Sequence, residues 1–141
     1  MYKDTTSELV ALAERKLAFL KQNPIGFSIS TMMAGAYVGI GIILIMTLGN
    51  DAPPASRNLI MGGFFGITLT LVIFAGAELF SGHTMFMTFG FLARKVKALH
   101  VLGDWVIAWS GNLVGAMLLG LLFTLGGGGG WLDDPTSLVH A

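Results

Sequence analysis

The strongest constraint on the fold of this sequence is a single carboxylate, Glu78, inside a long apolar run. Residues 58–93 contain no other Asp, Glu, Lys or Arg. As one straight helix rising about 1.5 Å per residue, the run would be about 54 Å long, nearly twice the roughly 30 Å of a bilayer's hydrocarbon core. We therefore expect the chain to break within this run. Non-helical backbone within a membrane is tolerated only where it is buried in protein or lines a water-filled cavity. Because Glu78 lies next to the expected break, its side chain is expected to face protein or water.

The composition places the chain in a membrane. Of the 141 residues, 54% are hydrophobic and 11% are charged, whereas roughly a quarter of the residues of a soluble domain are charged. The net charge of zero gives no indication of a nucleic-acid partner. The chain has no Cys and only three His, without the spacing of a metal site. We therefore expect no disulfides, no bound metal and no other cofactor.

Three stretches predict an all-α integral membrane protein with three transmembrane segments. They cover residues 22–50, 58–93 and 105–132, and only Glu78 interrupts them with a full charge. The second segment is expected to be broken by a loop at Ser81-Gly82. Residues 94–104 are expected to form a loop or surface turn, and residues 126–135, which begin with five Gly, a flexible exit loop.

The N-terminal residues 1–22 predict a separate amphipathic helix, followed by a membrane domain over residues 23–141. Thr5 and Glu8 fit a capping box at the start of this helix, and Pro24 ends it. Two interpretations stay open and are compatible with each other. The helix lies on the membrane surface, or it packs against neighbouring protein.

The basic residues indicate the orientation of the chain. Four precede the first span, three lie between the second and third spans, and Arg57 stands alone on the other side. The positive-inside rule then places the N-terminus and residues 94–100 in the cytoplasm. We expect a multi-pass membrane protein with its N-terminus in the cytoplasm.

Three sequence stretches, in this order, carry a resemblance to a known family: "AGAYVGIGIILI", "GAELFSGHTM" and "GNLVGA". The chain resembles the formate/nitrite transporter family, and most closely its NirC-type nitrite channels, from Asn23 to His140. The family usually has Thr where Ser81 stands, so the hydroxyl is kept. Its members are roughly twice as long and consist of two inverted halves. This sequence is similar to the first half, which implies half of an aquaporin-like inverted-repeat fold.

The resemblance also implies roles for residues near the break. Those that match the family's substrate pathway are Phe65, Leu69, Leu79 and Phe80 at apolar constrictions and Ser81 as a hydroxyl donor to the anion. Phe65 and Leu69, which are four residues apart on one helix face, are also explained as ordinary core packing, and Ser81 as a residue that bonds its own backbone. The family's central pore-facing His lies in its second half, and no His here matches it by position.

Glu78, Gly82 and Asn112 are expected to support the pore loop rather than to contact the substrate. Glu78 would accept hydrogen bonds from free N–H groups of the broken helix or from Asn112. The alternative for Glu78 is a proton relay or ion site, and for Asn112 it is contact with the ion. His83 is a candidate pH-sensitive residue, because an unperturbed imidazole titrates near physiological pH, but we expect it to be a polar loop residue near the cytoplasmic mouth.

The function that the resemblance implies is passage of nitrite, with formate-like anions as near substrates, and no enzymatic reaction. The implied partners are the lipid bilayer, the small anion and further copies of the chain in a homopentamer. A second chain that supplies the other half is also compatible with the sequence. The alternative function is a non-transporting membrane fragment that serves in assembly.

Overall fold

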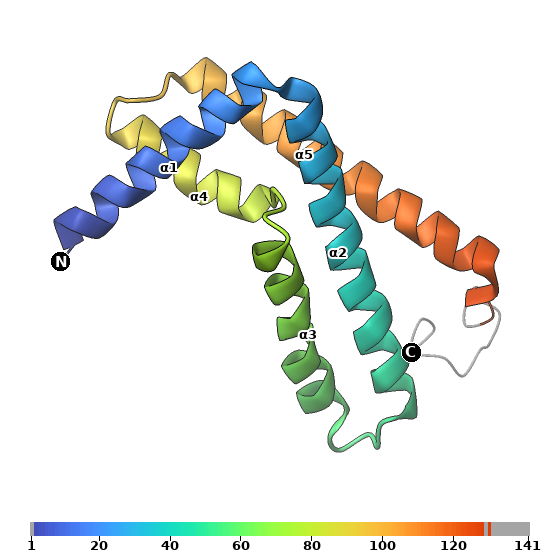
Figure 1. Ribbon diagram of the computed structural model, residues 1–141. Helices are drawn as coiled ribbons and strands as arrows, with labels where there is room; N and C mark the ends of the chain where they lie inside the picture. Colours follow the sequence, from blue (N-terminus) through green and yellow to red (C-terminus); the bar gives the residue numbers. More distant parts are fainter. Residues whose placement is uncertain (1, 129, 131–141) are drawn as a thin grey trace.

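The computed structural model describes residues 2–128 and 130, and within them it contains helices and no strands. Figure 1 shows the helices α1 (Tyr2–Gln22), α2 (Pro24–Asp51), α3 (Arg57–Phe74), α4 (Phe80–Leu92) and α5 (Ala98–Phe123), followed by the π-helical turn η1 (Thr124–Gly128). Three stretches are long and apolar enough to cross a membrane: Pro24–Asp51, Arg57–Phe74 and Ala98–Gly128. This confirms the all-α membrane fold with three candidate spans.

The second apolar run is broken between α3 and α4. Helix α3 ends in a Schellman motif, in which Ala77 N–H donates to Val72 O (3.0 Å) and Gly76 N–H donates to Ile73 O (3.1 Å). Gly76 adopts φ 62°, a left-handed conformation that favours glycine. The chain then leaves the axis of α3, and α4 runs away from it at an angle (Figure 1).

The position of this break corrects the sequence-based expectation. The unwound residues are 75–79, while Ser81 and Gly82 lie in the first turn of α4. The physical reason is that glycine interrupts a helix most effectively where a positive φ is required, which is the case at Gly76 and not at Gly82. Ser and Gly are tolerated in the first helical turn, where the N–H groups have no intrahelical acceptors.

Two other expected boundaries are wrong. Helix α1 already includes Tyr2, so Thr5 lies inside it and cannot be its N-cap. Helix α5 begins at Ala98, so most of the expected surface turn at 94–104 is helical. Of the expected exit loop, residues 126–128 belong to η1, while residues 129 and 131–141 lie outside the described part of the chain.

Helix α2 is the centre of the fold and packs against α5 on one side and α3 on the other (Figure 1). Glycines bring α2 and α5 into backbone contact. A Cβ added to Gly35 would overlap the backbone of Asn112, and one added to Gly115 would overlap the backbone of Met32. Small residues at these places allow the close approach that stabilises helix pairs in membranes.

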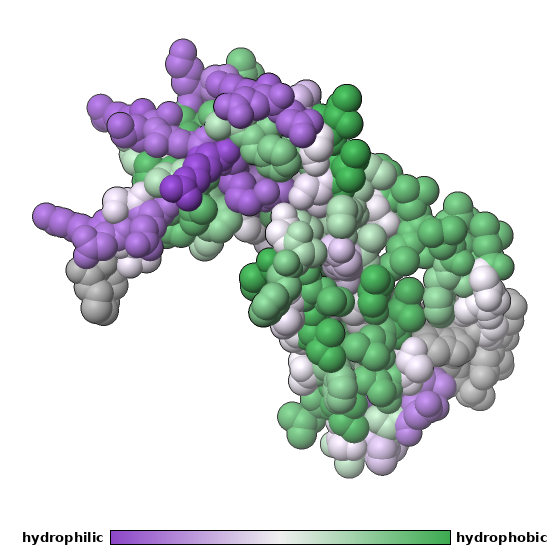
Figure 2. Space-filling model, in the orientation of Figure 1, coloured by the Kyte–Doolittle hydropathy of each residue, from purple (hydrophilic) through white to green (hydrophobic). Residues whose placement is uncertain are grey.

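Helix α1 packs against α4 through a small apolar core. Its buried members are Ala13, Met87, Val96 and Val101, and Leu17, Phe86 and Trp105 pack around them. Figure 2 shows hydrophilic surface gathered over α1 and hydrophobic surface over α2 and α3. The contact with α4 agrees with the interpretation in which α1 packs on protein, and the polar surface leaves the membrane-surface interpretation open.

We predict that Gly115→Ala will destabilise the protein by about 1–3 kcal/mol, because the new methyl group must push α5 away from α2. The measurement is the thermal unfolding midpoint of the protein in detergent. Gly120→Ala is the matched control, since it lies on the same helix with nothing within 4 Å of the added Cβ. This control should be neutral or slightly stabilising. Equal effects of the two substitutions would contradict the close contact.

Candidate functional site at the helix break

Asn112 of α5 holds the broken segment through its side-chain amide. Its Nδ2 donates to Thr31 O (2.8 Å) and to Glu78 O (3.0 Å), and its Oδ1 accepts from Phe80 N–H (2.9 Å). The N–H of Glu78 donates to Ser30 O of α2 (3.3 Å). One amide group thus joins α2, α5, the break and the first residue of α4, and it satisfies backbone groups that would otherwise be costly inside a membrane.

The Glu78 side chain forms part of a buried charged cluster, which consists of Lys16, Glu78, His83 and Asp104. Lys16 Nζ lies 2.6 and 2.7 Å from the two Glu78 carboxylate oxygens. His83 Nε2 lies 2.9 Å from Glu78 Oε2, and His83 Nδ1 lies 2.9 Å from Asp104 Oδ2. The relative exposures of Glu78, His83 and Asp104 are 5%, 1% and 0%. The charged cluster therefore connects α1, the break, α4 and α5.

Two expectations about these residues differ from the structure. His83 is not in a loop: it is a buried residue of α4, and its ring packs edge-to-face on Phe27 with the centroids 5.3 Å apart. The Glu78 carboxylate binds Lys16 and His83, while Asn112 binds the Glu78 backbone carbonyl instead. The Lys16 ammonium attracts the carboxylate with a full positive charge, which the neutral amide of Asn112 does not carry.

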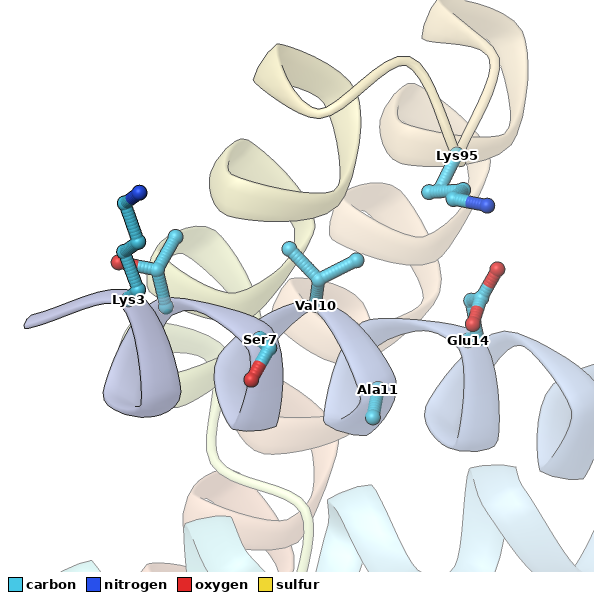
Figure 3. A pocket seen from close by; sticks show the side chains of 7 residues that line it. Lys3, Ser7, Val10, Ala11, Glu14 and Lys95 are labelled. Atoms are coloured by element: carbon cyan, nitrogen blue, oxygen red, sulfur yellow. The ribbon is translucent and has the colours of Figure 1, made fainter.

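A cavity of about 360 Å³ opens beside the break. It is lined by apolar residues of α1, α3 and α4, by the break itself and by members of the charged cluster: Leu12, Lys16, Leu69, Val72, Ile73, Gly76, Ala77, Glu78, Leu79, Ser81, Gly82, His83 and Phe86. A larger hollow of about 570 Å³ lies along the first half of α1, bordered by α1 side chains and by Lys95 (Figure 3). No residue of the break lines this larger hollow.

The cavity brings together three of the five residues expected along the substrate pathway. Leu69 of α3, Leu79 of the break and Ser81 of α4 all line it. Phe80 does not line it, although its N–H is held by Asn112. Phe65 lies one helical turn before Leu69 and is 38% exposed, outside the cavity. The pathway roles of all five remain proposals.

The cavity also adjoins the N-terminus of α4. Leu79 is the N-cap, and Ser81 and Gly82 occupy the first helical turn. N–H groups at these positions have no intrahelical acceptor, and the helix dipole makes this end partially positive. A negative solute in the cavity would therefore meet backbone donors and the Ser81 hydroxyl without a fixed positive charge dedicated to it.

Lys16 and Asp104 are the parts of this site that sequence reasoning missed. By sequence, Lys16 is one of several basic residues of an amphipathic helix, and Asp104 falls in an expected surface turn. One feature of the sequence could have indicated them. Glu78 and His83 lie five residues apart in an apolar run, and buried ionisable groups need partners of opposite charge from elsewhere in the chain. No group of side chains in the described part of the chain has the arrangement of a metal site.

Comparison with known proteins identifies the family. The model of the formate/nitrite transporter family matches residues 3–137. The chain belongs to this family. It is 49% identical over 141 residues to the nitrite transporter NirC of Escherichia coli K12, covering 100% of this chain and 52% of that protein. A probable formate transporter of Methanothermobacter thermautotrophicus is 34% identical over 122 residues, which cover 82% of this chain and 43% of that protein.

A solved structure agrees with these sequence matches. It is described as an ion channel of the formate/nitrite transporter family. The two structures match with a TM-score of 0.85 and 50% sequence identity, over 89% of this chain and 51% of the channel's chain. The chain thus spans about half the length of the relatives that it matches. These relatives are named as transporters and channels, not as enzymes.

We predict that Asn112→Ala will lower the stability of the protein by about 1–3 kcal/mol, because it leaves buried backbone groups of the break without partners. The measurement is the unfolding midpoint in mixed detergent. Ser110→Ala is the control, since the Ser110 hydroxyl bonds only carbonyl groups of its own helix. A shift no larger than that of the control would show that Asn112 does not hold the break.

Proposed function

We propose that this chain forms the first half of a channel for small monovalent anions, with nitrite as the principal substrate and formate-like anions as near substrates. The observation that carries the proposal is the cavity at the break, where apolar side chains, a hydroxyl and the N-terminus of α4 meet. The names of the relatives, a nitrite transporter and a probable formate transporter, support the choice of substrate.

The proposed mechanism is permeation without a fixed binding charge. The anion loses water at the apolar constrictions formed by Phe65, Leu69, Leu79 and Phe80. The Ser81 hydroxyl and the N–H groups of Ser81 and Gly82 in the first turn of α4 then replace part of its hydration. Dipoles of this kind favour a negative charge without holding it as tightly as a Lys or Arg would, so the anion can leave quickly. Lys16 does not serve as a binding charge, because Glu78 occupies its amine.

The remainder of the pore wall is proposed to come from a matching second half. Apolar side chains on α3 stand exposed, among them Phe64, Ile67, Ile73 and Phe74 at 44%, 42%, 73% and 88%. Only 11% of this span is buried within the described chain. Lipid, a second half or neighbouring copies in a homopentamer would cover such a surface. The bacterial inner membrane, with the N-terminus in the cytoplasm, is the proposed location, which the distribution of Lys and Arg supports.

We predict that Ser81→Ala will reduce nitrite flux about tenfold, because the anion loses one hydrogen bond from a neutral donor to a charged acceptor. Flux is measured by uptake into liposomes that contain the chain together with a chain that supplies the matching second half. Thr88→Ala is the control, since its hydroxyl bonds the backbone of its own helix and does not line the cavity. This control should retain the flux of the parent chain.

Two outcomes would contradict the proposal. Unchanged nitrite flux in Ser81→Ala would remove Ser81 from the pathway. Absence of flux in the parent chain, folded and reconstituted with the matching second half, would favour the alternative of a non-transporting membrane fragment.

A further inference from the structure

The charged cluster places two carboxylates and one imidazole within hydrogen-bond distance of each other, almost without access to water. Both ring nitrogens of His83 face a carboxylate oxygen at 2.9 Å. Each of these contacts requires a proton between nitrogen and oxygen, and a neutral imidazole carries only one N–H. The second proton lies either on the ring or on one carboxylate.

The net charge is the same in both cases. Glu78, His83 and Asp104 together, with two shared protons, carry one negative charge. Lys16 is the only cation from another helix that contacts this group in the described part of the chain, and it contacts both Glu78 oxygens. With Lys16 present the charged cluster is neutral. Without it, one unit of negative charge remains in a poorly hydrated place.

That charge would face the cavity. Lys16, Glu78 and His83 line it together with Ser81. Interactions between charges extend further and are screened less in a partly buried site than in bulk water. A residual negative charge here would repel any anion that approaches the Ser81 hydroxyl and would attract cations instead.

We propose that Lys16 is a specificity-determining residue that acts through Glu78: it cancels the negative charge of the Glu78–His83–Asp104 group and so keeps the cavity beside the break selective for anions. The inference builds on the proposed function. It gives α1, which lies outside the three candidate spans, a direct electrostatic role at the break. A merely structural tether between Lys16 and Glu78 would hold α1 in place but would not set the sign of the ion that the cavity accepts.

The test measures the electrostatic potential at Ser81 without relying on transport. The chain has no Cys, and Ser81 is exposed, so Ser81→Cys introduces a single accessible thiol in the cavity. The purified protein in detergent, at low ionic strength, reacts separately with an anionic sulfonatoethyl and a cationic trimethylammonium-ethyl methanethiosulfonate. Mass spectrometry gives both rates, and their ratio reports the local potential.

In this background, Lys16→Met should shift the rate ratio toward the cationic reagent by about fivefold or more. Glu78→Gln should shift it toward the anionic reagent, and the double variant Lys16→Met with Glu78→Gln should return it close to the parent value. Lys16→Arg, which keeps the charge, should leave the ratio unchanged. Lys3→Met is the matched control, because it removes the same charge from α1 at a position that does not line the cavity.

The proposal is overturned if Lys16→Met does not change the ratio, or if Glu78→Gln fails to restore it in the double variant. It is also overturned if neither reagent reacts, since the cavity would then be closed to solutes. Should Lys16→Met fail to fold, the opposite shift expected for Glu78→Gln alone still decides the question. Absence of nitrite flux in the parent chain, reconstituted with the matching second half, would contradict the proposed function but would leave this thiol measurement valid.

Discussion

The structure depends on satisfying the backbone groups of the break between the two apolar helices α3 and α4. Interrupting a spanning helix exposes N–H and C=O groups whose burial without partners costs several kcal/mol in hydrocarbon. Gly76 ends α3 by closing a hydrogen-bonded cap, and Asn112 supplies both a donor and an acceptor to the residues that follow. The close packing of α2 on α5 places Asn112 near enough to do this. The site is therefore held by the same contact that holds the fold.

The charged cluster is a second set of contacts that holds the break in place. A buried pair of charges stabilises a protein only when further hydrogen bonds complete it, and here Lys16, His83 and Asp104 complete the environment of Glu78. These residues come from three different helices, so the cluster connects the N-terminal helix with the core of the membrane domain. The charges of the cluster cancel, and its four side chains lie within hydrogen-bond distance of one another in a chain from Lys16 to Asp104. This explains how a carboxylate can border the proposed path of an anion.

Much of this could be predicted from the sequence, and the errors have physical causes. The length of the run around Glu78 requires an interruption, and the "GAELFSGHTM" stretch indicates the family. The sequence nevertheless favours a break at Ser81-Gly82 over the true one, because it does not reveal which glycine takes a positive φ. His83 is expected in a loop, since its partner Asp104 lies 21 residues away on another helix. The role of Lys16 is missed for the same reason, because it is 62 residues from Glu78.

Local composition and the fixed thickness of a bilayer are enough to establish that the chain is helical and apolar, and that a carboxylate must be accommodated within its second apolar run. The groups that accommodate this carboxylate are a property of the folded molecule. Lys16 lies 62 residues from Glu78 and meets it because α1 crosses α4. Asp104 lies 21 residues from His83 and reaches it because α5 packs beside α4. Interactions of this kind depend on distances in space, and helix periodicity carries no information about them.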